Sequence, residues 1–260
     1  MIRWFREIDE LLRGRKTSAE TLATGTRQLS LGAFSAASVV LGAVYGVCMG
    51  LYSVIGRETP EYRQLLATTV KVPLLFLLTL VVTFPSLYVF GALLGTRLKP
   101  LDMLRVIVAA IAVNVAVLAS LGPITAFFTL STESYHFMKL LNVGFFALAG
   151  LVGLGFLLSV LHRLEEACSE PVEVDALEGD SDRAQTLERL RRAHGPVQGT
   201  DMARRLFRVW LLVYALVGAQ MAWVLRPFIG SPELGFAWWR QRGGNFFLDV
   251  WQAIGRMVGS

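Results

Sequence analysis

Charged residues are scarce in this chain, and histidine and cysteine are scarcer still. Asp, Glu, Lys and Arg together make up 17% of the 260 residues, against about 25% in a typical soluble domain. The two cysteines, Cys48 and Cys168, lie in an apolar run and in a charged loop, so they do not predict a disulfide framework. The three histidines, His136, His162 and His194, fall in separate connections, which argues against a shared metal site.

The sequence also lacks the motifs of the common enzyme classes. It contains no P-loop, no glycine-rich dinucleotide pattern, no HExxH, no CxxC and no GxSxG. Between the ends of its apolar runs, as read from the sequence, there is no Asp, Glu or Lys, the residues that mark proton relays and ion-coupled transport. We therefore expect a protein that is not an enzyme and has no cofactor, and the case for an ion-coupled pump is weak.

What the chain has instead is a series of long apolar runs, which predict an all-α integral membrane protein with five transmembrane helices. The clearest run has 24 uncharged residues after Lys71, which would rise about 36 Å as a helix, enough for a hydrocarbon core of about 30 Å. The runs are the segment between Arg27 and Arg57, Lys71–Gly95, Val106–Thr132, Leu140–Leu161 and Leu206–Leu225, the last of which is free of charge only from Val209.

Two further expectations concern the second run. Pro73 and Pro85 interrupt it near each end. Residues 61–70 are expected to form an interfacial helix that leads into Lys71, so that this lysine marks the boundary of the span.

The distribution of basic residues predicts the orientation. With the N-terminus inside and five spans, the inside segments carry 17 of the 25 Lys and Arg residues, which favours a cytoplasmic N-terminus and an external C-terminus. If the fifth run only re-enters the membrane, the C-terminal tail returns to the cytoplasmic side. The predicted divisions are a cytoplasmic amphipathic segment (1–28), four spans (29–161), a cytoplasmic charged loop (162–205), the fifth span (206–226) and an aromatic interfacial tail (227–260).

Amphipathic patterns at both ends predict surface helices. Near the N-terminus the apolar residues from Trp4 to Leu12 recur at helical spacing, and the helix either lies in the headgroup layer or packs against a cytoplasmic loop of its own chain. In the tail, residues from Phe247 to Met257 show the same periodicity. Aromatic and basic residues that suit the membrane interface are the predicted anchors: Trp223, Arg226, Trp238 and Trp239.

A stripe of small residues runs along the first span and predicts close helix packing. Because lipid provides no hydrophobic drive between helices, association depends on close backbone approach, which small residues permit. The neighbour is either another helix of this chain or another copy. The stripe consists of Ser35, Ser38, Gly42, Gly46 and Gly50.

Neutral polar side chains inside the runs form a candidate polar path. Hydroxyl residues recur at i, i+4 and i+7 in the second and third runs, and we expect these two faces to meet each other. They either line a path for an ion or small polar solute, or form structural hydrogen bonds to the i−4 carbonyl and between helices. The residues are Thr79, Thr83 and Ser86 in the second run and Asn114, Thr125 and Thr129 in the third.

Three segments resemble a family of uncharacterised bacterial multi-span inner-membrane proteins. They are KVPLLFLLTLVVTFPSLYVFGALLG at 71–95, SLGPITAFFTLSTESYHFMKLLNV at 120–143 and WVLRPFIGSPELGFAWWRQRGGNFF at 223–247. The resemblance implies a multi-pass protein of the cell inner membrane. It implies no activity, substrate or catalytic residue.

These observations lead to two functional expectations. The first is a non-enzymatic integral membrane protein that acts by assembly, as a subunit or scaffold of a membrane complex, with membrane lipids and either further copies or another membrane protein as partners. The second is an oligomeric pore or passive transporter lined by the second and third spans. Nucleic acid is not an expected partner, because the basic residues flank the apolar runs, where they set orientation.

Overall fold

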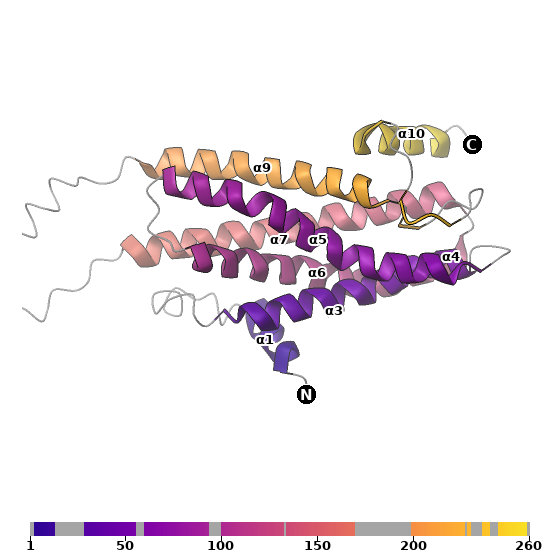
Figure 1. Ribbon diagram of the computed structural model, residues 1–260, viewed down its shortest axis with the longest axis horizontal. Coiled ribbons are helices and arrows are strands. Elements are labelled where there is room, and N and C mark those ends of the chain that lie inside the picture. The colour runs from indigo at the N-terminus through magenta and orange to yellow at the C-terminus, as the bar shows by residue number, and fades with distance from the viewer. Residues whose placement is uncertain are drawn as a thin grey trace, which may run out of the picture.

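The protein is an all-helical membrane protein in the part of the chain that the structure describes. The structure is a computed structural model and describes residues 3–13, 29–55, 60–93, 100–132, 134–169, 199–226, 228–229, 236–239 and 244–258. The helices are α1 (Arg3–Leu12), α3 (Leu31–Gly50), α4 (Tyr52–Ile55), α5 (Tyr62–Leu93), α6 (Pro100–Ser131), α7 (Tyr135–Ser169), α9 (Gly199–Leu225) and α10 (Phe246–Val258). The long helices run side by side along the length of the molecule (Figure 1).

Within the residues that the structure describes, four stretches are long and apolar enough to cross a membrane. They are Leu31–Ile55, Tyr62–Ser86, Pro100–Ser131 and Tyr135–Val160. The chain is therefore a multi-pass membrane protein. The apolar part of α9, Val209–Leu225, is shorter, so the fifth span and the orientation stay predictions.

Helix α3 lies at the centre of the bundle. It packs on α5 on one side and on α6 on the other, while α9 lies against α5 and α7 against α6. The core contains large side chains of α3 such as Phe34, Tyr45 and Met49, and an uninterrupted buried run from Val106 to Val115 in α6. Such a run has no polar face, as expected for a helix covered on most sides.

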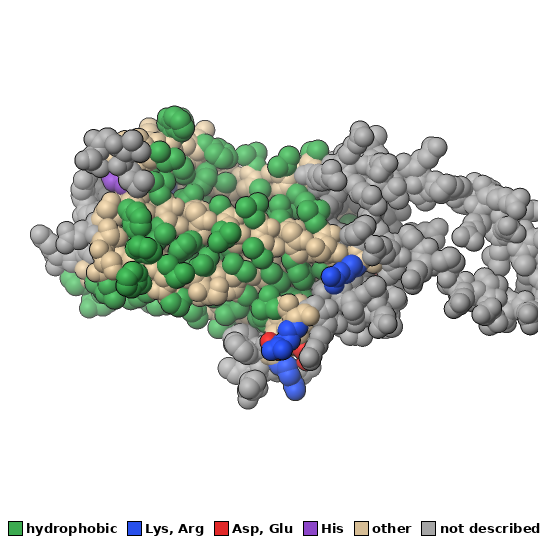
Figure 2. All heavy atoms as spheres, turned by 180° about the vertical axis from the view of Figure 1, so that it is seen from behind, with side chains coloured by type: hydrophobic (Ala, Val, Ile, Leu, Met, Phe, Trp, Pro, Cys, Tyr) green, Lys and Arg blue, Asp and Glu red, His purple; other side chains and the backbone are tan. Residues whose placement is uncertain are grey.

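The outer surface of the bundle is apolar. Figure 2 shows hydrophobic side chains over the side of the bundle, while the charged side chains that it draws lie on α1 and toward one end. Val81, Leu151 and Leu212 are among the large apolar residues that are mostly exposed. A soluble protein rarely exposes so large an apolar area, whereas acyl chains would cover it in a bilayer.

Helix α5 differs from the expectation in a way that matters. It begins at Tyr62, runs without a break through Pro73 and Pro85, and contains Lys71 in its interior. The expectation that residues 61–70 continue as a helix into Lys71 agrees with this helix, while its interfacial position stays a prediction. The apolar stretch of α5 that is long enough to span a membrane is Tyr62–Ser86 and includes Lys71, whereas the predicted run began at this lysine because the uncharged sequence starts after it.

Two other helices also have ends that differ from the predicted ones. Helix α7 continues past Leu161 to Ser169, and α9 begins at Gly199, before Leu206. The rest of the predicted cytoplasmic loop, residues 170–198, lies outside the described residues.

Both terminal helices pack on the bundle. Ile8 and Leu11 of α1 are buried in the main core, and among the described residues α1 contacts α3 and α6, so it rests on these two helices. Helix α10 contacts α7 and α9, with Asp249 paired to Lys139 at the start of α7. It turns Phe247 and Trp251 outward.

Candidate functional site

The glycines of the small-residue stripe bring α3 and α5 into backbone contact. A Cβ atom added at Gly46 would lie 2.8 Å from Thr69 Cα and 2.9 Å from the Thr68 carbonyl oxygen. At Gly42 it would meet Pro73 at 3.3 Å, and at Gly50 the Cα atom of Leu65 at 3.1 Å. The close neighbour is therefore α5 of the same chain, and no second copy can use this face while α5 occupies it.

The two serines of the stripe have lesser roles. Ser38 is buried and donates a hydrogen bond to the Phe34 carbonyl at 2.8 Å, which satisfies its hydroxyl within α3. Ser35 is half-buried. The tight α3–α5 contact is made by the glycines.

The hydroxyl face of α5 turns toward α9. Thr79 and Thr83 donate to the carbonyls one turn earlier, at 2.8 and 2.7 Å, and both are buried. Ser86 accepts a hydrogen bond of 3.0 Å from the indole Nε1–H of Trp210 in α9. A Cβ atom at Gly218 of α9 would lie 3.8 Å from the Thr79 methyl group.

The hydroxyl face of α6 turns toward α3 instead. Thr125 and Thr129 also bond to carbonyls one turn earlier, at 3.4 and 3.0 Å. Gly122, on the same side of the helix, faces Cys48 and Tyr45 of α3. The prediction that the two hydroxyl faces meet each other was wrong, because α3 lies between most of α5 and α6.

The last candidate of the polar path, Asn114, lies between α6 and α7. A Cβ atom at Gly153 of α7 would be 2.9 Å from Asn114 Cβ, so this glycine makes room for the amide. The Asn114 Oδ1 atom is buried and has no hydrogen-bond donor. The six path residues thus fall in three separate helix contacts.

A second polar row occupies the first half of α5, and sequence reasoning missed it. Gln64, Thr68 and Lys71 are spaced at i, i+4 and i+7, and all three are buried. Gln64 Nε2 donates to the Phe228 carbonyl at 2.8 Å, and the Thr68 hydroxyl donates to the same oxygen. The row therefore holds the chain that follows α9.

Lys71 is the charged member of this row. Its side chain is only 2% exposed, and its ammonium donates to the Trp238 carbonyl at 2.6 Å. The ammonium also lies 5.3 Å from the centre of the Trp239 ring, a cation–π distance. A lysine within a membrane span is costly to bury, so these contacts mark a site that the fold maintains. The signal was present in the sequence, because the 64–68–71 spacing continues the face of Thr79, Thr83 and Ser86.

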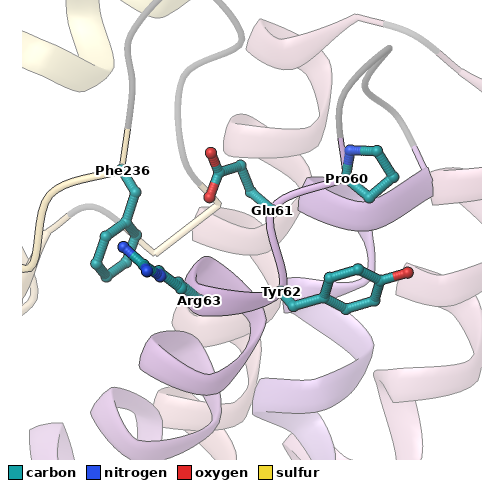
Figure 3. Close-up of a pocket in the computed structure, with 5 residues that line it drawn as sticks. All are labelled: Pro60, Glu61, Tyr62, Arg63 and Phe236. Carbon is teal, nitrogen blue, oxygen red and sulfur yellow. The ribbon is translucent and has the colours of Figure 1, made fainter.

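Phe236 also reaches the start of α5. It lines an open pocket of about 540 Å³ together with Pro60, Glu61, Tyr62 and Arg63. In Figure 3 the side chains of Phe236 and Arg63 point toward each other, while Tyr62 points away. The described residues after α9 thus contact α5 at several places.

The predicted interface anchors lie in two different settings. Trp238 and Trp239 are about half exposed, as an interfacial position requires. Trp223 is buried, and the guanidinium carbon of Arg226 lies 3.5 Å from the centre of its ring. The indole Nε1–H of Trp223 has no acceptor.

Helix α7 has the least covered face of the four candidate spans. The bundle buries 22% of its most apolar window, against 44–61% in the others. Gly144 and Gly155 are exposed, and a Cβ atom added at either would meet nothing within 4 Å. Leu151 lies between them on the same face and is 69% exposed.

Comparison with family models, curated proteins and solved structures found no match for this chain. The resemblance to bacterial inner-membrane proteins therefore stays a prediction. Within the described residues, no group of His, Cys, Asp and Glu side chains is arranged to hold a metal ion.

Proposed function

We propose that this protein is a non-enzymatic, five-span protein of a bacterial inner membrane that acts by assembly, and that the open face of α7 is its assembly surface. The face is defined here as Gly144, Leu148, Leu151, Gly155 and Ser159. The small-residue stripe of α3, which from the sequence could also have met another copy, is not this surface, because α5 of the same chain fills it. The N-terminus is cytoplasmic in this proposal, on the evidence of the basic residues.

One observation carries the proposal, namely small residues on an uncovered helix face. Gly144 and Gly155 bring little surface to a contact with lipid, and a helix that packed on them would gain close backbone approach. Ser159 is exposed on the same side, but its hydroxyl donates to the Gly155 carbonyl at 2.9 Å, so it adds no unsatisfied group. The face is therefore smooth, apolar and suited to a transmembrane helix.

The alternative of a pore or passive transporter has less support. Its proposed lining, the hydroxyls of α5 and α6, is divided between contacts with α9 and with α3. Thr79, Thr83, Thr125 and Thr129 are buried and bonded within their own helices, as structural hydroxyls are.

Photo-crosslinking in cells tests the assembly proposal. A photoreactive residue at Leu151 is compared with one at Val81, which lies on α5 at a similar distance from the helix start and is similarly exposed, 66% against 69%. The expected result is a discrete adduct from position 151 and none from position 81. The mass of the adduct tells whether the neighbour is a second copy or another membrane protein.

Two outcomes would contradict the proposal. One is the absence of any protein adduct at position 151 under conditions in which the variant inserts normally. The other is an equal adduct at both positions, which would mean random collision in the membrane.

A further inference from the structure

The end of α9 contains a buried hydrogen-bond donor without an acceptor. Trp223 is 7% exposed, and its Nε1–H has no acceptor among the described residues. An indole nitrogen is a donor only, so nothing but an acceptor can satisfy it. A buried donor without one costs about 1–3 kcal/mol, and such atoms usually have a structural or functional reason.

A cation lies directly against this donor. The guanidinium carbon of Arg226 is 3.5 Å from the centre of the Trp223 ring, so the charge is stacked on the indole. Arg226 follows the last helical residue, where a positive charge also suits the carbonyl end of the helix. That effect explains a cation at this place, but it leaves the indole donor unexplained.

We propose that Trp223 and Arg226 form a binding site for a phosphate group. An acceptor oxygen would satisfy the indole N–H, and a negative charge would suit the guanidinium stacked on the ring; phosphate supplies both. Arginine is also well suited to phosphate, because its planar donors match the spacing of the oxygens. In the proposed five-span arrangement, on which this choice of ligand rests, the end of α9 lies at the depth of lipid headgroups, so the phosphodiester of an anionic lipid is the source that fits.

The site does not depend on the proposed assembly through α7, which lies on a different helix. The group of Trp223 that would contact the phosphate is its indole N–H. The ring can be kept and the donor removed by Trp223→Phe, which leaves an apolar surface for Arg226 to stack on. In the absence of phosphate this variant is expected to be at least as stable as the natural protein, because it removes an unsatisfied donor.

The experiment measures the melting temperature of the full chain in a phosphate-free maltoside detergent. Phosphatidylglycerol is titrated in one arm, inorganic phosphate in a second and the neutral lipid diacylglycerol in a third. Trp223→Phe and Arg226→Gln are compared with Trp251→Phe, which removes an indole N–H from a mostly exposed tryptophan of α10. The expected result is that phosphatidylglycerol stabilises the natural protein and Trp251→Phe, with about tenfold weaker apparent binding in the two site variants.

The arms separate the outcomes. Stabilisation by inorganic phosphate alone, lost in both site variants, would support the site with a soluble ligand as its source. An equal response of the natural protein and Trp223→Phe to phosphatidylglycerol would overturn the proposal. A response as large to diacylglycerol would also overturn it, since the phosphate would then play no part.

Discussion

The contact between α3 and α5 can be tested at one atom, by Gly46→Ala. The new Cβ would lie 2.8 Å from Thr69 Cα and 2.9 Å from the Thr68 carbonyl oxygen. Carbon atoms that are not bonded pack at about 3.5–4.0 Å, so the overlap is roughly 0.7 Å or more. Both neighbours are backbone atoms, and no side-chain rotation can relieve the clash.

The expected cost follows from two opposing effects. Overpacking of a tight contact destabilises by about 1–3 kcal/mol, because the helices must separate and lose dispersion contacts. Alanine gains about 0.5–1 kcal/mol over glycine as a helix former. The net expectation is a loss of about 1–2 kcal/mol in the free energy of unfolding.

Gly150→Ala is the matched control. It adds the same methyl group to a helix interior outside the proposed assembly surface, but nothing lies within 4 Å of the new atom. Only the gain in helix formation remains, so this variant is expected to be as stable as the natural protein or more stable. Unfolding in maltoside micelles by increasing dodecyl sulfate, followed by circular dichroism, measures both. Equal stability of Gly46→Ala and Gly150→Ala would refute the packing argument.

Two further predictions concern the polar contacts of α5. Lys71→Met keeps an unbranched side chain, one atom shorter, but removes the donor to the Trp238 carbonyl, so a cysteine placed at Ala237 is expected to react several times faster with a water-soluble maleimide. An unchanged rate would mean that the lysine does not hold this segment. Ser86→Ala removes the acceptor used by Trp210 and is expected to cost about 1–3 kcal/mol, measured by the same unfolding titration. The double variant Ser86→Ala with Trp210→Phe should lose less stability than the two single variants lose together, because Trp210→Phe removes the donor whose acceptor Ser86→Ala has taken away. Strict additivity would contradict a direct hydrogen bond.

Sequence reasoning reached the class of the fold because apolar length and glycine spacing act locally. Four of the apolar runs correspond to helices long enough to span a membrane. The glycine stripe predicted a close neighbour, because residues without a Cβ atom allow two helix backbones to come into contact. Which helix that neighbour is depends on tertiary packing, which no spacing within α3 reports.

The errors arose where a polar residue has a distant partner. Lys71 was placed at the start of a run because a lysine in lipid is costly. Its partners Trp238 and Trp239 lie 167 and 168 residues later in the sequence, so no local pattern reports them. The hydroxyl faces of α5 and α6 were paired because the two runs are consecutive and share one pattern. The structure inserts α3 between them, so similar faces meet different neighbours.

The polar row of α5 depends on partners that are synthesised much later than α5 itself. Its hydrogen bonds reach residues 160 to 167 positions later in the chain. A ribosome that adds about 5–20 residues per second needs roughly 8–30 s to synthesise the chain between the polar row and these partners. During that time α5 is already available for insertion. Throughout that interval Lys71 must be accommodated without the Trp238 carbonyl, by water, by lipid headgroups or by the insertion machinery. The second span of this protein therefore reaches its final environment only after the chain beyond α9 has been made.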